Sequence, residues 1–267
     1  MGADIKSLRT RIKSVNSTLH LTKAMGLVAS SKIRRASEAM AKGREYAAAV
    51  KEVASQLTLS PECRKSPYMQ KRDTGRTKLI VIAGDRGLAG GYNANIFRLV
   101  KEYPGAEIIP VGKYACDRFG GELILAENAT YSDAKRIADS LCRGFESEEY
   151  DRLGIVCTKY ISMMSQEAHV EWVLPLEKNT DGKSVGTIFE PDEVTVFNSM
   201  IPEYVAGVLV ACIRESFACE VAARRVAMDS AGKNAQEMLD DLGLAYNRAR
   251  QSAITQEITE IVAGSGL

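Results

Sequence analysis

Residues Ala222–Val262 read AARRVAMDSAGKNAQEMLDDLGLAYNRARQSAITQEITEIV, and no proline occurs anywhere after Pro202. Apolar residues recur through this part of the chain in steps of three, four and seven, which is the spacing of a helix seam that packs against a partner helix. The seam positions are Phe217, Val221, Met228, Ala231, Ala235, Met238, Leu242, Ala245 and Ala249, and the last turns place Ile254, Ile258, Ile261 and Val262 on one face. An uninterrupted helix from Ile201 to Leu267 would reach roughly 90 Å, so we expect it to project from the rest of the chain.

The beginning of the chain carries a second seam of the same kind, from Ile5 to about Ser60. One heptad position holds Ile5, Ile12, Leu19, Gly26, Ile33, Met40, Ala47 and Ala54, and the other holds Leu8, Val15, Thr22, Ala29, Ala36, Gly43, Val50 and Leu57. This strict alternation predicts a coiled coil, and the small residues at mid-length predict a close approach of the partner backbone. The natural partner is the C-terminal helix. We therefore expect an antiparallel pair made by the two ends of the chain, with everything between them inserted at one end.

The first helix has an unbalanced charge. Between Ile5 and Ser37 the sequence has no carboxylate but eight basic residues: Lys6, Arg9, Arg11, Lys13, Lys23, Lys32, Arg34 and Arg35. An exposed helix ordinarily mixes both signs, so the stretch indicates an acidic partner, with a merely solvated face as the alternative. A nucleic acid is the second option, but the stretch lacks the aromatic residues and the known folds that accompany nucleic-acid recognition. We favour an acidic protein surface.

The middle of the chain alternates between strand and helix patterns. Strands are predicted at 78–83, 106–111, 152–157 and 168–174, with a further short strand as an option at 123–125, and helices at 93–102, 113–119 and 132–145. This order favours a small, mostly parallel sheet with covered faces. The predicted fold class is α/β: a Rossmann-like domain over 75–195, inserted between a coiled-coil helix over 1–60 and another over 200–267. The polar, turn-rich residues 178–198 lead into the last helix.

A glycine-rich loop, Gly84–Gly91, follows the first predicted strand and resembles a phosphate-binding turn. Its glycines do not follow G-x-G-x-x-G, and no Gly-Lys-Ser/Thr follows, so a nucleotide-dependent enzyme is the weaker hypothesis. We predict a tight turn packed against another part of the chain, with Asp85 and Arg86 fixing it.

Catalytic patterns are missing from the sequence. The two histidines, His20 and His169, are isolated, and the six cysteines are scattered without metal spacing, which is typical of reduced thiols in a cytosolic protein. The start lacks the apolar core of a signal peptide, and the longest apolar run, Val205–Ile213, is too short to span a bilayer. We expect a soluble chain with no cofactor and no enzymatic activity of its own, whose membrane association is indirect.

Both ends of the chain resemble the γ subunits of F-type ATP synthases. The matching runs are IKSLRTRIKSV (5–15) and LTKAMGLVASSKIRRA (21–36) at the front, and AARRVAM (222–228) and YNRARQSAITQEITEIVAG (246–264) at the back. In the middle, DRGLAGG (85–91) is similar to a family motif. The resemblance spans the whole length and is strongest at the ends.

The resemblance implies a non-catalytic rotor shaft. The paired helices would stand inside a ring of alternating α and β subunits, and the middle domain would form a foot on the membrane c-ring beside the ε subunit. The shaft would couple ion-driven rotation to ATP synthesis or hydrolysis at the β subunits. The implied location is the cytoplasmic face of a bacterial membrane, as a peripheral protein without direct membrane insertion, and nucleic acid is not among the implied partners.

The resemblance also implies which residues meet these partners. The ring contacts would be Met25, Lys32, Arg34, Arg35, Arg224, Arg250, Gln251, Thr255, Glu257, Ile258 and Ile261, and the foot residues near the c-ring and ε would be Phe189, Glu190 and Asp192. Three positions depart from the family: Gly26 replaces a common acidic residue, Arg225 a common Met, and Asp229 a common Lys. The cysteine-bearing insertion of chloroplast-type chains is missing, so no thiol switch of that kind is expected.

Overall fold

The computed structural model describes residues 2–72, 74–178 and 189–264. The Cα packing divides the chain into two compact units. One, here called the helical unit, comprises Met1–Ser30 and Arg224–Leu267, and the other, the sheet unit, comprises Ser31–Ala223. This division differs from the three predicted parts because each long helix contributes to both units. The predicted three-part division stays a prediction.

Two long helices carry the predicted seams. Helix α1 spans Gly2–Leu57 and helix α5 spans Glu193–Gly264. None of the sixteen predicted seam positions on α1 is exposed. On α5 the seam is buried or half-buried except at Met238, which is 44% exposed, and at Ala245, so the predicted contact is wrong at these two positions.

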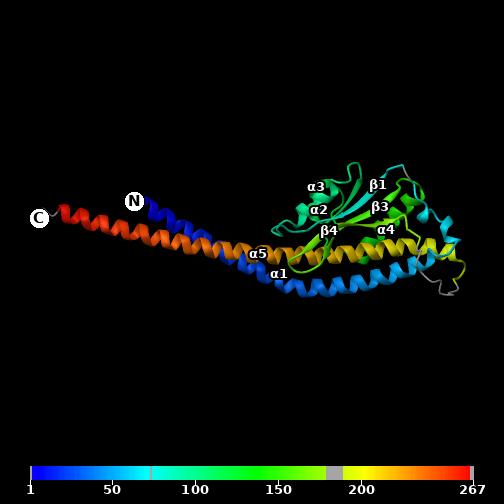
Figure 1. The fold of residues 1–267 in the computed structure, drawn as a ribbon, viewed down its shortest axis with the longest axis horizontal. Helices are drawn as coiled ribbons and strands as arrows, with labels where there is room; N and C mark the ends of the chain where they lie inside the picture. Colours follow the sequence, from blue (N-terminus) through cyan, green and yellow to red (C-terminus); the bar gives the residue numbers. More distant parts are fainter. Residues whose placement is uncertain (1, 73, 179–188, 265–267) are drawn as a thin grey trace. The chain divides into compact units, whose positions relative to one another are not determined.

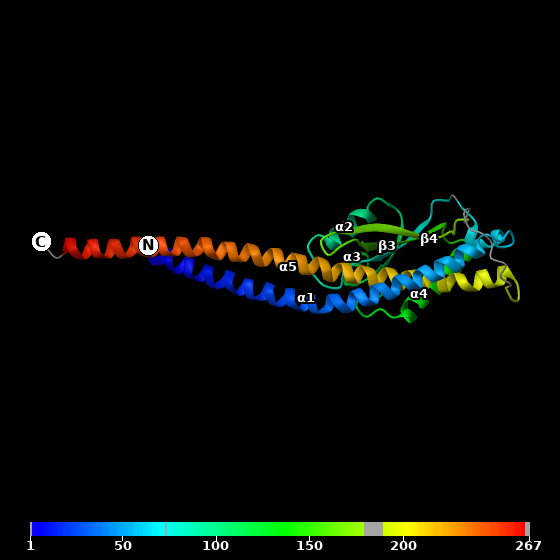
Figure 2. The ribbon, with the colours of Figure 1, turned by 60° about the horizontal axis from the view of Figure 1, so that its bottom comes forward.

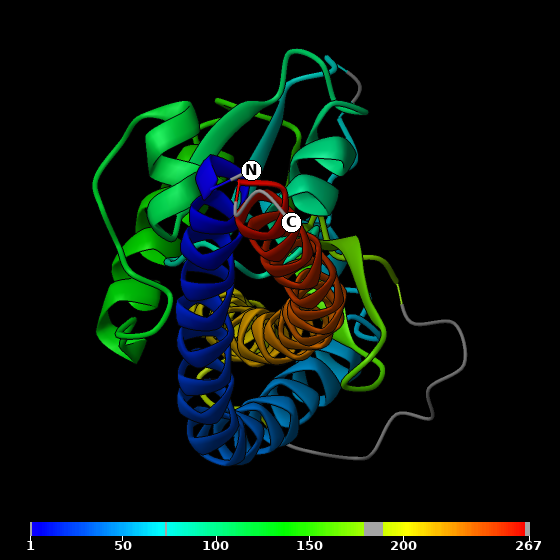
Figure 3. The ribbon, with the colours of Figure 1, turned by 90° about the vertical axis from the view of Figure 1, so that its left-hand side faces the viewer.

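The helices pack as an antiparallel pair within each unit. In the helical unit a Cβ on Gly26 would lie 3.7 Å from Met228 Cβ, and one on Gly232 would lie 3.6 Å from Thr22 Oγ1. Figure 3 shows these two segments side by side at the ends marked N and C. In the sheet unit a Cβ on Gly43 would lie 3.3 Å from Ala211 Cα, and Figure 2 shows the two helices next to each other there. The small residues therefore serve the close approach that the sequence predicts.

Helix α5 begins earlier than the predicted residue 200. Asp192 caps it, because its carboxylate accepts the backbone N–H of Thr195 at 2.9 Å and the Thr195 hydroxyl at 2.7 Å. The helix then continues through Pro202, which removes one helical hydrogen bond and ordinarily kinks or ends a helix. The fully buried neighbours Phe197 and Ile201 hold this first segment against the core, and their burial offsets that cost.

The sheet has four strands in the order β2-β1-β3-β4. β1 (Thr77–Ile82) pairs in parallel with both β2 (Glu107–Val111) and β3 (Arg152–Tyr160), and β4 (Gln166–Leu174) runs antiparallel to β3. The remaining elements are α2 (Tyr92–Val100), α3 (Lys113–Phe119), α4 (Tyr131–Glu146) and two short 3-10 turns, Cys63–Lys65 and Pro67–Met69. The predicted α/β fold class with terminal helices is confirmed.

Both faces of the sheet are covered (Figure 1). Alternate residues of β1 point to opposite sides: Leu79 and Val81 join a core with α2 and α3, while Ile80 and Ile82 join a core with α4 and α5. Strands buried on both faces read as continuous apolar runs, which is why residues 78–83 look like a buried strand in the sequence.

Two details differ from the sequence prediction. Residues 123–125 form no strand; the Gly112 N–H donates to Ile124 O at 2.7 Å, and this single bond starts no ladder. Helix α4 begins at Tyr131 rather than at the predicted residue 132, and its cap is Thr130, because Thr130 and Asp133 form a reciprocal capping box.

By length and composition, α5 could cross a membrane: one 18-residue window has a mean hydropathy of 1.6. This differs from the sequence expectation because the helix extends beyond the apolar run Val205–Ile213. In the structure 61% of that window is buried. A mostly buried core helix passes the same test of length and composition, so this single helix is weak evidence for a membrane span.

Candidate functional site

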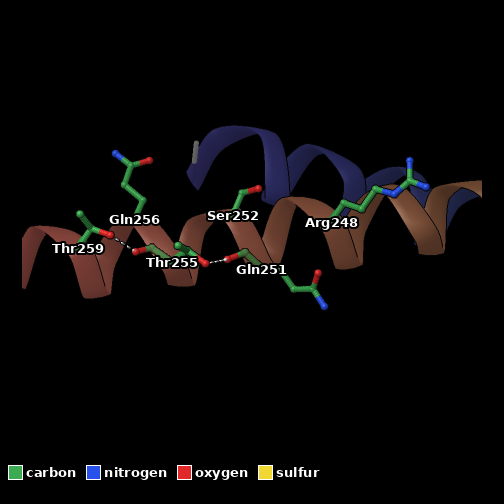
Figure 4. A pocket seen from close by; sticks show the side chains of 6 residues that line it. All are labelled: Arg248, Gln251, Ser252, Thr255, Gln256 and Thr259. Carbon is green, nitrogen blue, oxygen red and sulfur yellow. Dashed lines mark hydrogen bonds between the residues drawn. The ribbon is translucent and has the colours of Figure 1, made fainter.

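The C-terminal end of α5 exposes two different faces. Ile254, Ile258, Ile261 and Val262 are 47%, 57%, 71% and 60% exposed. A neighbouring face forms an open polar groove lined by Arg248, Gln251, Ser252, Thr255, Gln256 and Thr259 (Figure 4). The hydroxyls of Thr255 and Thr259 bond back to the helix, to Gln251 O at 2.9 Å and to Thr255 O at 2.8 Å. Apolar side chains beside a polar groove are suited to a protein partner rather than to solvent alone.

The structure places the predicted residues of this end together on one segment. Arg250, Gln251, Thr255, Glu257, Ile258 and Ile261 are all exposed. Their contact with a partner stays a prediction. Met25 and Arg224 differ from them, because Met25 is half-buried and Arg224 is only 9% exposed.

The basic stretch of α1 divides into paired and unpaired cations. Lys32 is half-buried and forms an ion pair with Glu127, which also pairs with Arg86 at 3.1 Å. Arg34 is 3.7 Å from Glu38, but its side chain is 81% exposed, and such pairs contribute little. Arg35 is exposed and has no ion pair with any described residue. Arg34 and Arg35 therefore present positive charge outward, whereas Lys32 is already engaged within the sheet unit.

The three positions at which the resemblance implies a departure from the family pattern lie close to one another in the helical unit. Arg225 and Asp229 form an ion pair along α5 at 2.9 Å. A Cβ on Gly26 would lie 3.3 Å from Arg225 Nη1 and 3.9 Å from Asp229 Oδ1. A larger acidic side chain at position 26 would meet this ion pair, so a glycine at this position leaves room for Arg225 and Asp229.

The predicted foot residues have mainly local roles in the described structure. Phe189 packs partly buried against the main core, and Glu190 is exposed. Asp192 caps α5, and the hydrogen bonds from Thr195 lower the pKa of its carboxyl. Residues 179–188 of the predicted polar connection lie outside the described residues. The contact of these three residues with a partner stays a prediction.

The glycine-rich loop 84–91 is closed by the chain itself. Backbone N–H groups of Asp85 and Arg86 donate to the two carboxylate oxygens of Glu220 on α5, each at 3.2 Å. The Asp85 carboxylate accepts the N–H groups of Lys113, Ala126 and Glu127 at 3.1, 3.1 and 2.8 Å. The predicted tight turn is therefore present, with Asp85 fixing it and α5 as the element packed against it.

The described residues contain no group of three or more His, Cys, Asp or Glu arranged to hold a metal. All six cysteines are free thiols. His169 lies 3.8 Å from Glu171, whose pKa falls to about 2 because of the His169 ring and Lys51. These groups tie α1 to β4 and do not converge on a cavity.

Comparison with known proteins places the chain in a family. A profile of the ATP synthase family matches residues 4–266. The ATP synthase gamma chain of Ruminococcus albus is 42% identical over 98% of both chains. A gamma chain from Geobacter sp. strain M21 is 38% identical over 98% of both, and the "ATP synthase gamma chain, sodium ion specific" of Acetobacterium woodii is 36% identical over 99% of both.

The fold is shared with solved rotor chains. A chain from the Euglena gracilis mitochondrial ATP synthase, in a structure of its OSCP/F1/c-ring, aligns with a TM-score of 0.69. It is 19% identical, and the alignment covers 100% of the present chain and 97% of that one. A chain from the central stalk and c-ring of the Tetrahymena thermophila enzyme aligns over 79% of this chain, with a TM-score of 0.62 and 21% identity.

A pair of long terminal helices with an α/β domain inserted between them is the fold that this chain shares with those solved chains. The chain belongs to the ATP synthase gamma chain family. It is thus a central-stalk subunit of an F-type ATP synthase and is not catalytic by itself, which confirms the predicted family and role.

Proposed function

We propose that the chain is the rotating shaft through which ion-driven rotation of a c-ring is coupled to ATP synthesis or hydrolysis at β subunits. Its helical unit stands inside a ring of alternating α and β subunits, and its sheet unit forms the foot, beside the c-ring and the ε subunit. The complex lies at the cytoplasmic face of a bacterial membrane, and the chain itself is peripheral to it. The observation that carries the proposal is the exposed end of α5, where Ile254, Ile258 and Ile261 are 47%, 57% and 71% exposed.

The ring contacts follow from this arrangement. Ile258 and Ile261 meet an apolar sleeve, while Gln251, Thr255 and Glu257 meet polar loops of β. The outward cations Arg34 and Arg35 meet acidic segments of the ring. Met25, Lys32, Arg224 and Arg250 belong to the same proposed interface, although Lys32 and Arg224 would need to exchange internal contacts for external ones.

Coupling in this proposal is a matter of differential contact. The two helix faces differ around the shaft, so each rotational angle offers different contacts to each β subunit. A ring state can be favoured only by as much as its contacts with the shaft differ from those of the other states. The shaft therefore selects which β site is open without performing any chemistry.

Reconstitution into vesicles tests the proposal. The complete complex with this chain is expected to pump ions when it hydrolyses ATP, and the complex lacking it is expected to hydrolyse ATP without pumping. Equal pumping with and without the chain would contradict the proposed coupling role.

A further inference from the structure

The glycine-rich loop lies where an α/β sheet ordinarily binds a ligand. β1 stands between β2 and β3, and all three strands are parallel; the chain leaves the carboxyl end of β1 through α2 toward β2, while β3 lies on the other side of β1. The crevice at the carboxyl end of such a strand is the usual ligand position in open α/β sheets. Residues 83–91 follow β1 directly and border this crevice.

Glu220 of α5 occupies the position that a bound anion would take. Its two carboxylate oxygens accept the consecutive backbone N–H groups of Asp85 and Arg86, and the residue is only 1% exposed. Consecutive N–H groups that converge in this way form an anion-binding nest. The nest in this chain is therefore filled by an internal carboxylate.

The loop is shaped around that carboxylate. A Cβ on Gly84 would lie 3.0 Å from Glu220 Cδ and 3.2 Å from Asn93 Oδ1, which accepts the Gly84 N–H at 2.9 Å. A larger residue at position 84 would displace Glu220 or break the bond to α2. The close approach requires the glycine.

One turn earlier, α5 makes further polar bonds to the end of β3 and to α2. Ser216 Oγ accepts the Thr158 N–H at 3.1 Å, and Ser216 O accepts the Tyr92 hydroxyl at 2.9 Å. Glu215 Oε1 accepts the Tyr160 N–H at 2.8 Å. Apolar packing is non-directional, whereas hydrogen bonds are directional, so these bonds fix the rotation of α5 about its own axis against the strands.

We infer that Glu220 is a positioning residue that locks α5 to the sheet, so that torque applied to the sheet unit turns the helix without slip. The claim that Glu220 transmits torque rests on the proposed function, whereas the claim that its carboxylate fills the Asp85–Arg86 nest does not. The lock consists of the Glu220 carboxylate in the Asp85–Arg86 nest, supported by Glu215 and Ser216.

The first experiment measures the nest on the isolated full chain. Glu220→Ala is expected to lower the thermal unfolding midpoint by roughly 5–10 °C, since a buried charged hydrogen-bond acceptor is lost. Glu220→Gln keeps the shape of the side chain but turns an amide donor toward one of the N–H groups. Its unfolding midpoint should lie between those of the wild type and Glu220→Ala. The matched control, Glu102→Gln, changes an exposed carboxylate of the same unit and should melt like the wild type.

Acetate provides the specific readout. It should raise the midpoint of Glu220→Ala, by refilling the nest, more than chloride does at equal ionic strength, and should leave the wild type and Glu102→Gln unchanged. A midpoint for Glu220→Ala equal to that of the wild type, or a response no larger to acetate than to chloride, would overturn the filled nest.

The second experiment measures the lock in the assembled α/β complex. A bead attached near Glu102 on the sheet unit reports the angular spread during pauses under ATP. Glu220→Ala and Glu220→Gln should widen that spread beyond any difference between the wild type and Glu102→Gln. An unchanged spread in a rotating complex would overturn the inference. A wild-type complex that does not rotate would instead refute the proposed function and leave the acetate result standing.

Discussion

Deleting residues from Ser252 onward should weaken binding to the α/β ring while leaving the stability of the sheet unit nearly unchanged. Between Ser252 and Gly264 every described residue except Ala253 is exposed, so the deleted segment buries almost nothing within the chain. The free energy of unfolding of the sheet unit should change by less than about 0.5 kcal/mol, as for surface changes in general.

The loss of ring binding should be much larger. Ile254, Ile258, Ile261 and Val262 are each about half to two-thirds exposed. Burying the exposed part of each side chain is worth roughly 1–2 kcal/mol, or about 4–8 kcal/mol for the four. The costs of association offset part of this free energy, so the four side chains should contribute roughly 2–4 kcal/mol to binding. The Kd for an α/β ring should therefore rise roughly 30- to 1,000-fold on deletion.

Two measurements check the prediction on the same protein. Trp172, the single tryptophan, lies on β4 and reports unfolding of the sheet unit by fluorescence. Titration of labelled chain with purified ring gives Kd. A full-length variant with Ser at the four apolar positions keeps the helix length and should reproduce most of the loss. Cooperative melting of the sheet on truncation, or unchanged ring binding, would refute the reasoning.

Three further predictions concern packing, pH and ligands. Gly154→Ala should destabilise the sheet unit by about 1–3 kcal/mol, because its Cβ would lie 2.8 Å from Val170 Cγ1; an unchanged denaturant midpoint would contradict this. The pKa of Glu171 is lowered to about 2 by His169 and Lys51, so its contribution to stability is present above pH ~4.5 and is lost as the pH falls toward 2. Glu171→Gln should flatten the acid limb of the stability curve, and an equally steep limb would show that other groups cause it. Calorimetry should detect no binding of ATP or NAD to the isolated chain, and any affinity for DNA or RNA should vanish at physiological ionic strength; tight binding in either test would restore an alternative function.

The long helices and the central sheet could be predicted because their patterns are local and repeated. The heptads of α1 extend over its whole length, and β1 contains the uninterrupted apolar run that starts at Leu79. The start of α5 could not be predicted in the same way. In the sequence, Pro202 indicates a helix boundary. The helix nevertheless begins at the Asp192 cap, because Phe197 and Ile201 are buried in a core that the other elements supply.

The candidate site was only partly readable from sequence. The exposed end of α5 follows from its own pattern, but the engagement of Lys32 depends on Glu127, 95 residues away. Glu220 gave a weak signal: a carboxylate within a run of apolar and small residues, Phe217–Ala223, at a position that the helix period assigns to the core. A buried carboxylate needs donors, and the glycine-rich loop is the place in the sequence that offers them, yet linking the two required the fold.

Rotation of single complexes tests the central claim most directly. The chain, with a bead on its sheet unit, would be assembled with α and β subunits and observed under ATP. The rotor account predicts stepping in one direction with three main pauses per turn, one for each β subunit. A stable complex that hydrolyses ATP while the bead stays fixed would contradict it and make the chain a static scaffold.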